Sequence, residues 1–185
     1  MPQSFTRNKM NLREEILFEH SKAQCSKIVA WVGDSQERFN ELFKLFIGDE
    51  EYRVVQRAAW PVSYCVEAHP KLIKPNFSKL IKNLQKPNLH DAVKRNSTRL
   101  LQHVDIPEKY QGDVMNLCFA WVESPTEAIA VKVFSLTVLG NLSNLYPEII
   151  PEIKLLIDDQ LPHATPGFKS RAKLLLKQFE QRNKV

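Results

Sequence analysis

Two arginines and two aromatic residues in the first half of the chain have the types and the spacing of a ligand-binding stripe. They follow one another at intervals of four, three and four residues: Arg53, Arg57, Trp60 and Tyr64. A helix turns once in about 3.6 residues, so this spacing predicts one shared helix face. An exposed Trp flanked by arginines can anchor a peptide or stack on a nucleic-acid base. The alternative is that Trp60 packs on a neighbouring helix and the arginines are only solvated.

Positive charge is concentrated just after this stripe. Between residues 71 and 99 the only acid is Asp91, against eight basic residues: Lys71, Lys74, Lys79, Lys82, Lys86, Lys94, Arg95 and Arg99. This local excess is larger than the net charge of +5 of the whole chain. A basic patch of Lys79, Lys82, Lys86 and Lys94 could bind phosphates without sequence preference. Plain solvation of an exposed helix face is the competing interpretation.

Combinations for catalysis or metal binding are sparse. The five histidines are far apart in sequence, and no His-x₃-His or Cys-x₂-Cys spacing occurs. No glycine-rich phosphate loop or nucleophile elbow is present. As acid–base pairs, Trp121 with Glu123 and Asp158 with Asp159 are weak candidates: the first is more typical of a helix end and the second of a loop cap. We therefore predict no catalytic residue, no metal site and no cofactor, and the sequence favours a protein that is not an enzyme.

Composition is that of a soluble folded protein. The chain has 185 residues, of which 43% are hydrophobic and 25% charged. Residues 1–13 are polar and basic and lack the apolar core of a secretory signal. No apolar run reaches the roughly 20 residues of a membrane-spanning helix. The odd number of cysteines, three, favours reduced thiols. We expect a cytoplasmic protein with no membrane association.

Local signals predict helices along nearly the whole chain. Glycines at positions 33 and 48 follow apolar series and are suited to end helices. Three predicted starts pair a capping oxygen with a glutamate three residues later: Asn11 with Glu14, Asp34 with Glu37, and Ser124 with Glu127. Thr165 before Pro166 predicts a further start.

An internal repeat organises these helices. An apolar residue, usually a basic one, two variable residues and usually a small one recur from Val55, Val93, Val131 and, in degenerate form, Ser170. The period is close to 39 residues, which indicates a stack of similar helical hairpins. The second helix of each hairpin is expected to begin near Glu51, His90, Thr126 and Gly167. We predict one domain over 1–185, with a capping helix and four repeats: 10–33, then about 35–69, 70–106, 107–146 and 147–182.

The repeated pattern and its period resemble HEAT repeats, a subclass of the armadillo-like superhelix. The resemblance covers about residues 35–182. It implies an all-α superhelix of about four hairpins whose second helices line a concave surface. The stripe on the first of these helices would then lie in the groove, with Arg95 and Arg99 of the next repeat beside it.

Two functions follow as hypotheses. The first is a scaffold that binds a protein segment on its concave surface. The second is a nucleic-acid binder in which the lysines and the same groove act together. HEAT-like DNA alkylation-repair glycosylases, which the chain resembles in outline, hold a damaged duplex in a basic groove lined with Trp, Arg and Asp. No aspartate of this chain can be matched to theirs. The identity of the partner and the oligomeric state are open.

Overall fold

The computed structural model describes residues 10–48 and 51–182. These ranges contain ten α-helices, three short 3₁₀-helices and no strand, so the predicted all-α fold is confirmed. The elements are α1 (Leu12–Phe18), α2 (Lys22–Val32), α3 (Gln36–Gly48), α4 (Tyr52–Ala68), η1 (Pro70–Asn76), α5 (Phe77–Leu84), α6 (Asp91–Leu101), α7 (Glu108–Glu123), α8 (Ile129–Leu142), η2 (Pro147–Ile149), α9 (Ile150–Gln160), η3 (Leu161–His163) and α10 (Pro166–Arg182).

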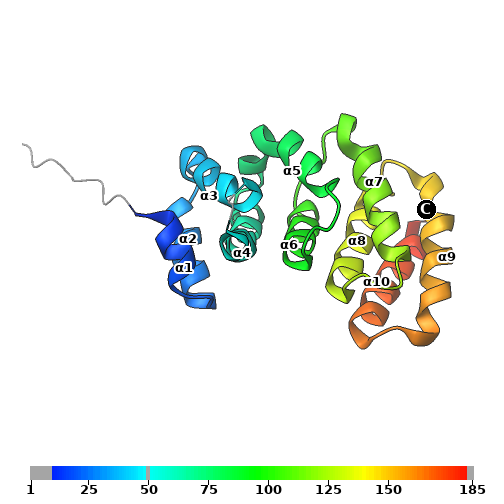
Figure 1. Ribbon diagram of the computed structural model, residues 1–185. Coiled ribbons are helices and arrows are strands. Elements are labelled where there is room, and N and C mark those ends of the chain that lie inside the picture. The colour runs from blue at the N-terminus through cyan, green and yellow to red at the C-terminus, as the bar shows by residue number, and fades with distance from the viewer. Residues whose placement is uncertain (1–9, 49–50, 183–185) are drawn as a thin grey trace, which may run out of the picture.

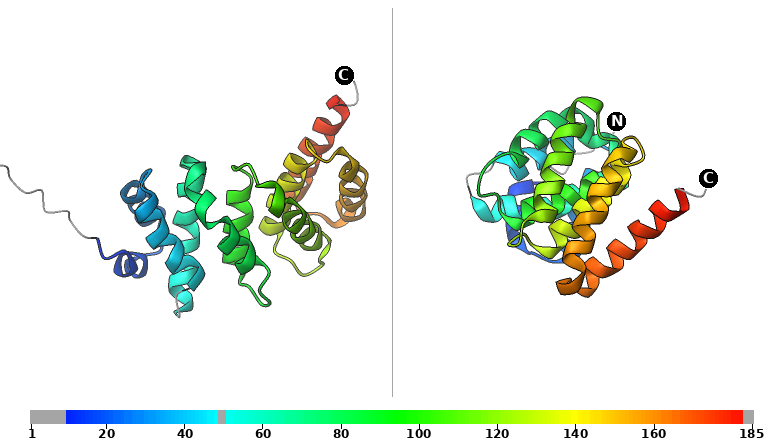
Figure 2. Two further views of the ribbon diagram at one scale, coloured as in Figure 1. Left: turned by 90° about the horizontal axis from the view of Figure 1, so that it is seen from above. Right: turned by 90° about the vertical axis from the view of Figure 1, so that its right-hand side faces the viewer.

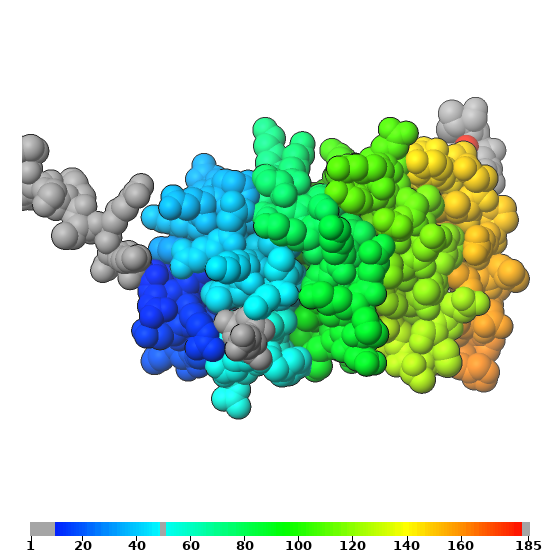
Figure 3. Space-filling model, turned by 45° about the horizontal axis from the view of Figure 1, so that its top comes forward, coloured from blue at the N-terminus to red at the C-terminus, as the bar shows by residue number. Residues whose placement is uncertain are grey.

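The helices form two layers of a stack (Figure 1). The first helices of the hairpins are α3, α5, α7 and α9, and the second helices are α4, α6, α8 and α10. Each second helix packs extensively against the next one, whereas successive first helices touch at few positions. Figures 2 and 3 show the pairs following one another in chain order. The layer of second helices is therefore the continuous part of the fold.

The segment 10–33 forms two helices where the sequence analysis expected one capping helix. The helix α1 ends at Phe18, and α2 begins after Ser21, whose hydroxyl accepts a hydrogen bond from the backbone N–H of Gln24 at 3.1 Å. The Gln24 side chain donates to the carbonyl of Glu15 at 2.7 Å, which holds α1 against α2. The two helices lie against α4 and cap the stack.

The expected helix ends are met at some positions and shifted at others. Gly33 ends α2 with φ of 53°, a conformation that favours glycine. Pro166 is the first residue of α10, as predicted. Helix α3 is capped by the Ser35 hydroxyl, not by Asp34. Helix α8 begins at Ile129, several residues after the expected start, because residues 124–128 form the turn that follows α7.

The core runs without interruption along the stack. Its largest fully buried side chains include six phenylalanines, from both ends of the chain: Phe39, Phe43, Phe46, Phe77, Phe168 and Phe179. Burying one such side chain contributes about 1.5–3 kcal/mol relative to its exposure. A single hairpin cannot bury its apolar face alone, so neighbouring hairpins stabilise one another.

Hydrogen bonds between neighbouring helical hairpins join residues that are about one sequence period apart. The Gln36 amide donates to the carbonyl of Leu72 at 2.9 Å, across 36 residues. The Asn141 amide reaches the carbonyl of Gln102 at 3.1 Å, across 39 residues. The Gln160 amide reaches Val122 at 2.6 Å, across 38 residues. The two last carbonyls lie at or near helix ends, where no intrahelical donor satisfies them. One period in the sequence therefore corresponds to one step from a helical hairpin to the next in the stack.

No helix in residues 10–48 and 51–182 is long and apolar enough to span a membrane. Most of residues 1–13, for which the sequence predicts no secretory signal, lies outside the described residues.

Candidate interaction surface

The predicted stripe lies on α4 and faces away from the core. Arg53 is exposed, and Arg57, Trp60 and Tyr64 are partly exposed. The opposite side of α4 is buried, for example at Val62. We call the exposed side of α4, α6, α8 and α10 the second-helix face. The four stripe residues occupy its N-terminal part.

Trp60 is partly covered by the N-terminal cap. Its ring meets His20, in the turn between α1 and α2, edge-on at 5.7 Å between centroids, and it meets Tyr64 at 6.1 Å. Trp60 therefore packs on a neighbouring segment through part of its indole ring only, and the side chain stays partly exposed.

Arg57 holds the cap in place. Its Nη1 donates to the carbonyl of Leu17 in the last turn of α1 at 2.8 Å. Carbonyls at the C-terminal end of a helix lack intrahelical donors and carry partial negative charge, so a guanidinium there is favourable. This contact ties α1 to α4 across 40 residues and occupies at least one donor of Arg57.

Arg99 lies against the stripe, where the sequence analysis placed it. Its guanidinium carbon lies 3.9 Å from the centre of the Tyr64 ring. The same guanidinium donates to Glu67 Oε2 at 2.5 Å and to Ser63 Oγ at 3.2 Å. These contacts join α6 to α4 and fix the orientation of Tyr64. Stacking on an aromatic ring combined with an ion pair is a typical arginine arrangement.

Arg53 and Arg95 are cations close to the stripe that stay available for a partner. Both side chains are exposed. Within the described ranges neither guanidinium makes an ion pair or a hydrogen bond. Asp91 lies one helical turn before Arg95 but does not pair with it. Arg53 lies two helical turns before Trp60 on α4, and Arg95 lies one turn before Arg99 on α6. Both arginines are therefore close to a cluster of Trp60, Tyr64 and Arg99 whose geometry is already fixed.

The lysine patch lies on the other layer. Lys79, Lys82 and Lys86 are exposed on or just after α5, whose opposite side is buried at Leu80 and Ile81. Helix α5 belongs to the first helices, whereas the stripe belongs to the second (Figure 1). The two sets of residues do not line one common groove, contrary to the arrangement expected from the sequence.

Lys94 does not belong to this patch. It lies on α6, and its Nζ is 2.6 Å from Glu127 Oε2 in the turn before α8. The two side chains are only 19% and 6% exposed. The pair connects the second repeat to the third. Lys132, 38 residues later in the sequence, makes the equivalent contact with Gln160 at 2.9 Å.

Tyr110 extends the surface that carries the lysine patch. Its ring stacks on Phe77 at 5.8 Å, and Lys109 lies 4.8 Å from its centre. A hydrogen bond with Ser78 and the charges of Lys109 and Lys82 hold the pKa of Tyr110 below its ordinary value. The hydrogen bond with Ser78 is the largest cause of this shift, and the two lysines add to it.

Arg171 is a residue of the second-helix face that the sequence analysis missed. It lies on α10 and is partly exposed. Arg57, Arg95 and Val133 follow one another at intervals of 38 residues, and Arg171 follows after another 38. These positions form one row across α4, α6, α8 and α10. The repeat period is the sequence signal that identifies Arg171, because this residue lies at the same repeat position as Arg57 and Arg95.

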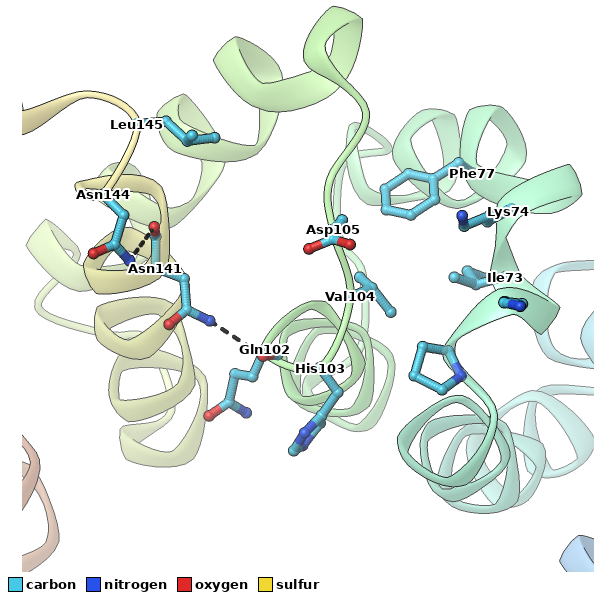
Figure 4. A pocket seen from close by; sticks show the side chains of 12 residues that line it. Ile73, Lys74, Phe77, Gln102, His103, Val104, Asp105, Asn141, Asn144 and Leu145 are labelled. Atoms are coloured by element: carbon cyan, nitrogen blue, oxygen red, sulfur yellow. Dashed lines mark hydrogen bonds between the residues drawn. The ribbon is translucent and has the colours of Figure 1, made fainter.

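A cavity of about 710 Å³ lies between the loops that follow the second helices (Figure 4). Its lining includes Lys74, His103, Asn141 and Leu145, from three successive connections. Asn141 is already engaged with the carbonyl of Gln102. Both polar and apolar side chains line it. No described group of three or more His, Cys, Asp or Glu side chains could hold a metal ion there or elsewhere.

The cysteines are poor nucleophiles. All three are buried and unpaired. Burial raises the pKa of Cys25 to about 11 and those of Cys65 and Cys118 to about 12. A thiol with such a pKa stays protonated at neutral pH, and the thiolate is the reactive form.

Fold and surface together define an α-solenoid: hairpins stacked in one direction, with side chains for contact on the second helices. The family model of the HEAT repeat domain matches residues 12–179. The chain therefore belongs to the HEAT repeat family, and the family resemblance seen in the sequence is confirmed. Comparison with curated proteins and with solved structures gave no match.

Proposed function

We propose that this chain is a non-enzymatic scaffold that binds a segment of a partner protein along the second-helix face, the side that corresponds to the concave surface of HEAT superhelices. The observation that carries the proposal is the combination of two exposed arginines, which have no ion pair or hydrogen bond among the described residues, with a fixed aromatic cluster close to them. Arg53 and Arg95 are the cations, and Trp60 and Tyr64 supply the aromatic surface.

The energetics of this surface favour binding. Tyr64 is held by Arg99, and Trp60 by His20, so little side-chain entropy remains to be lost when a partner docks. Aromatic and arginine side chains contribute most of the binding energy in many protein interfaces. An exposed arginine without an internal acceptor keeps its fork of donors for a carboxylate or a carbonyl of the partner.

The proposal is tested with random-peptide phage display against the purified protein. We expect selected peptides to bind the wild type and to lose about tenfold or more in affinity for the double variant Arg53→Glu/Arg95→Glu. The variant Lys79→Glu/Lys82→Glu makes the same charge change on the other layer and serves as the control. Absence of any selected peptide, or equal loss in both variants, would contradict the proposal.

Nucleic-acid binding is the second candidate, carried by a different observation. Five lysines on or just after η1 and α5 are exposed, and none of them makes an ion pair within the described residues: Lys71, Lys74, Lys79, Lys82 and Lys86. This surface would bind phosphates without the aromatic stripe, so the geometry does not favour a glycosylase-like groove. Binding of a short labelled duplex that falls steeply with salt and is lost in Lys79→Glu/Lys82→Glu/Lys86→Glu would support it. No binding at low salt would exclude it.

A further inference from the structure

The second-helix face changes its chemistry from α6 to α10. On α6 the exposed cation is Arg95, and on α10 the partly exposed Arg171 occupies the equivalent repeat position, beside the exposed Lys169, Lys173 and Lys177. Between them, α8 presents Ile129, Val133 and Thr137, which carry no charge. Ile129 is 42% exposed although it is apolar. The order across the three helices is therefore cation, apolar strip, cation.

The apolar strip is reinforced from α10. Leu174 lies one turn after Arg171 and is 54% exposed. Val133 packs on the core with one side and leaves the other partly exposed. Arg171, like Arg95, has no ion pair or hydrogen bond within residues 10–48 and 51–182. Exposed apolar side chains next to unpaired cations are costly to leave in water and are typical of binding sites.

The spacing across these helices fits an extended chain. Helices α6 and α8, and α8 and α10, are packed neighbours, and packed helix axes lie about 8–10 Å apart. An extended polypeptide advances about 3.3 Å per residue. One step from helix to helix thus corresponds to about three residues of an extended partner.

We infer that the partner segment is an extended peptide with the pattern acidic, two residues, apolar, two residues, acidic. Its carboxylates pair with Arg95 and Arg171, and its apolar side chain lies on Ile129 and Val133, beside Leu174. This inference rests on the proposed function, because it names the partner of the same surface. Asp91, one turn before Arg95, disfavours a further acid in that direction.

The probe is an 11-residue fluorescein-labelled peptide with Glu at its third and ninth positions and Leu at its sixth, in a Gly-Ser background. A second peptide carries the glutamates at its fifth and seventh positions, and a third replaces the leucine by glycine. Fluorescence anisotropy measures their affinities. We expect the first peptide to bind at least tenfold more tightly than either control. Equal binding of the compressed peptide would overturn the inference.

Charge reversal gives the decisive comparison. We expect Arg95→Glu and Arg171→Glu each to weaken binding of the first peptide about tenfold, while Lys173→Glu, on another side of α10, changes it less than twofold. A peptide with Lys at its ninth position should bind Arg171→Glu better than it binds the wild type. Loss of binding without this rescue would contradict the pairing, and thermal melts of each variant exclude misfolding as its cause.

The phage-display result separates this inference from the proposed function. Selected peptides with another pattern that still depend on Arg53 and Arg95 would overturn the inference and leave the scaffold function standing. Selected peptides that are indifferent to Arg53, Arg95 and Arg171 would overturn both. Enrichment of the acidic–apolar–acidic pattern would support both.

Discussion

The pair between Lys94 and Glu127 offers the sharpest test of how neighbouring repeats are held together. Lys94→Met keeps most of the side-chain volume but removes the cation that lies 2.6 Å from Glu127. Because Glu127 is only 6% exposed, its carboxylate would be left largely desolvated without its strongest partner. It would keep the hydrogen bond that its Oε1 accepts from the backbone N–H of Ala128 at 3.2 Å.

The expected loss follows from two bounds. Breaking a fully buried ion pair costs about 3–5 kcal/mol, and an exposed pair is worth at most about 1 kcal/mol. With side chains 19% and 6% exposed, we expect Lys94→Met to lower the free energy of unfolding by about 2 kcal/mol. For a chain of this size that corresponds to a fall in Tm of about 4–8 °C. Glu127→Gln should cost less, about 1 kcal/mol, because Lys94 can turn toward water.

The assay is urea unfolding followed by circular dichroism for the wild type, Lys94→Met, Glu127→Gln and the double variant. We expect the double variant to be more stable than the sum of the single losses implies, with a coupling energy of about 1 kcal/mol. A loss below about 0.5 kcal/mol for Lys94→Met, or no coupling, would refute the reasoning. Lower affinity for DNA with unchanged stability would instead return Lys94 to the phosphate-binding patch.

Three further outcomes are expected. Ser97→Ala should raise the free energy of unfolding by about 1 kcal/mol in urea titrations, because the Ser97 hydroxyl is buried without a hydrogen-bond partner among the described residues. Alanine is expected to fit, since Ala59 occupies the same repeat position. A lower free energy of unfolding in the variant would show that the hydroxyl does have a hydrogen-bond partner. Gly140→Ala should lower the free energy of unfolding by about 1 kcal/mol, because the added methyl group would lie 2.4 Å from Leu175 Cδ1. The cost of this overlap exceeds the gain in helix propensity. A variant more stable than the wild type would refute this expectation. Burial raises the pKa of Cys118 from 9.0 to about 12, so above pH 9 only the unfolded state loses this proton, and the free energy of unfolding falls from about pH 9 to pH 12. Cys118→Ala should remove about 1.4 kcal/mol of the fall in this free energy between pH 8 and pH 10. An unchanged slope of Tm against pH in the variant would contradict this expectation.

Local chemistry was sufficient to predict the helices that carry strong end signals. Gly33 adopts the positive φ that its position after an apolar series predicted, and Thr165 with Pro166 begins α10. The break between α1 and α2 escaped notice because no glycine or proline marks it, and a lone Ser21 is a weak signal. The pairing of Ser124 with Glu127 was wrong in the other direction: it predicted a helix start, but Pro125 lies between these residues, and proline suits a turn as well as the first turn of a helix.

The candidate site was predictable only where its contacts lie on one helix. The spacing of Arg53 to Tyr64 placed these residues on one face of α4 because the helix period dictates it. The partner of Lys94 is 33 residues away, so no local pattern distinguishes a lysine that bridges two repeats from one that faces solvent. Whether a lysine patch and an arginine stripe face the same groove depends on the layer, which only the packed structure shows.

The unequal packing of the two layers has a mechanical consequence. Because the second helices are tightly packed, the distances between them should stay nearly constant when the solenoid bends. Bending should change the gaps between the first helices and the loops around the cavity of about 710 Å³. The distances from Arg95 to Val133 and on to Arg171 would change little. The spacing that a bound peptide must match should thus persist while the curvature of the solenoid varies.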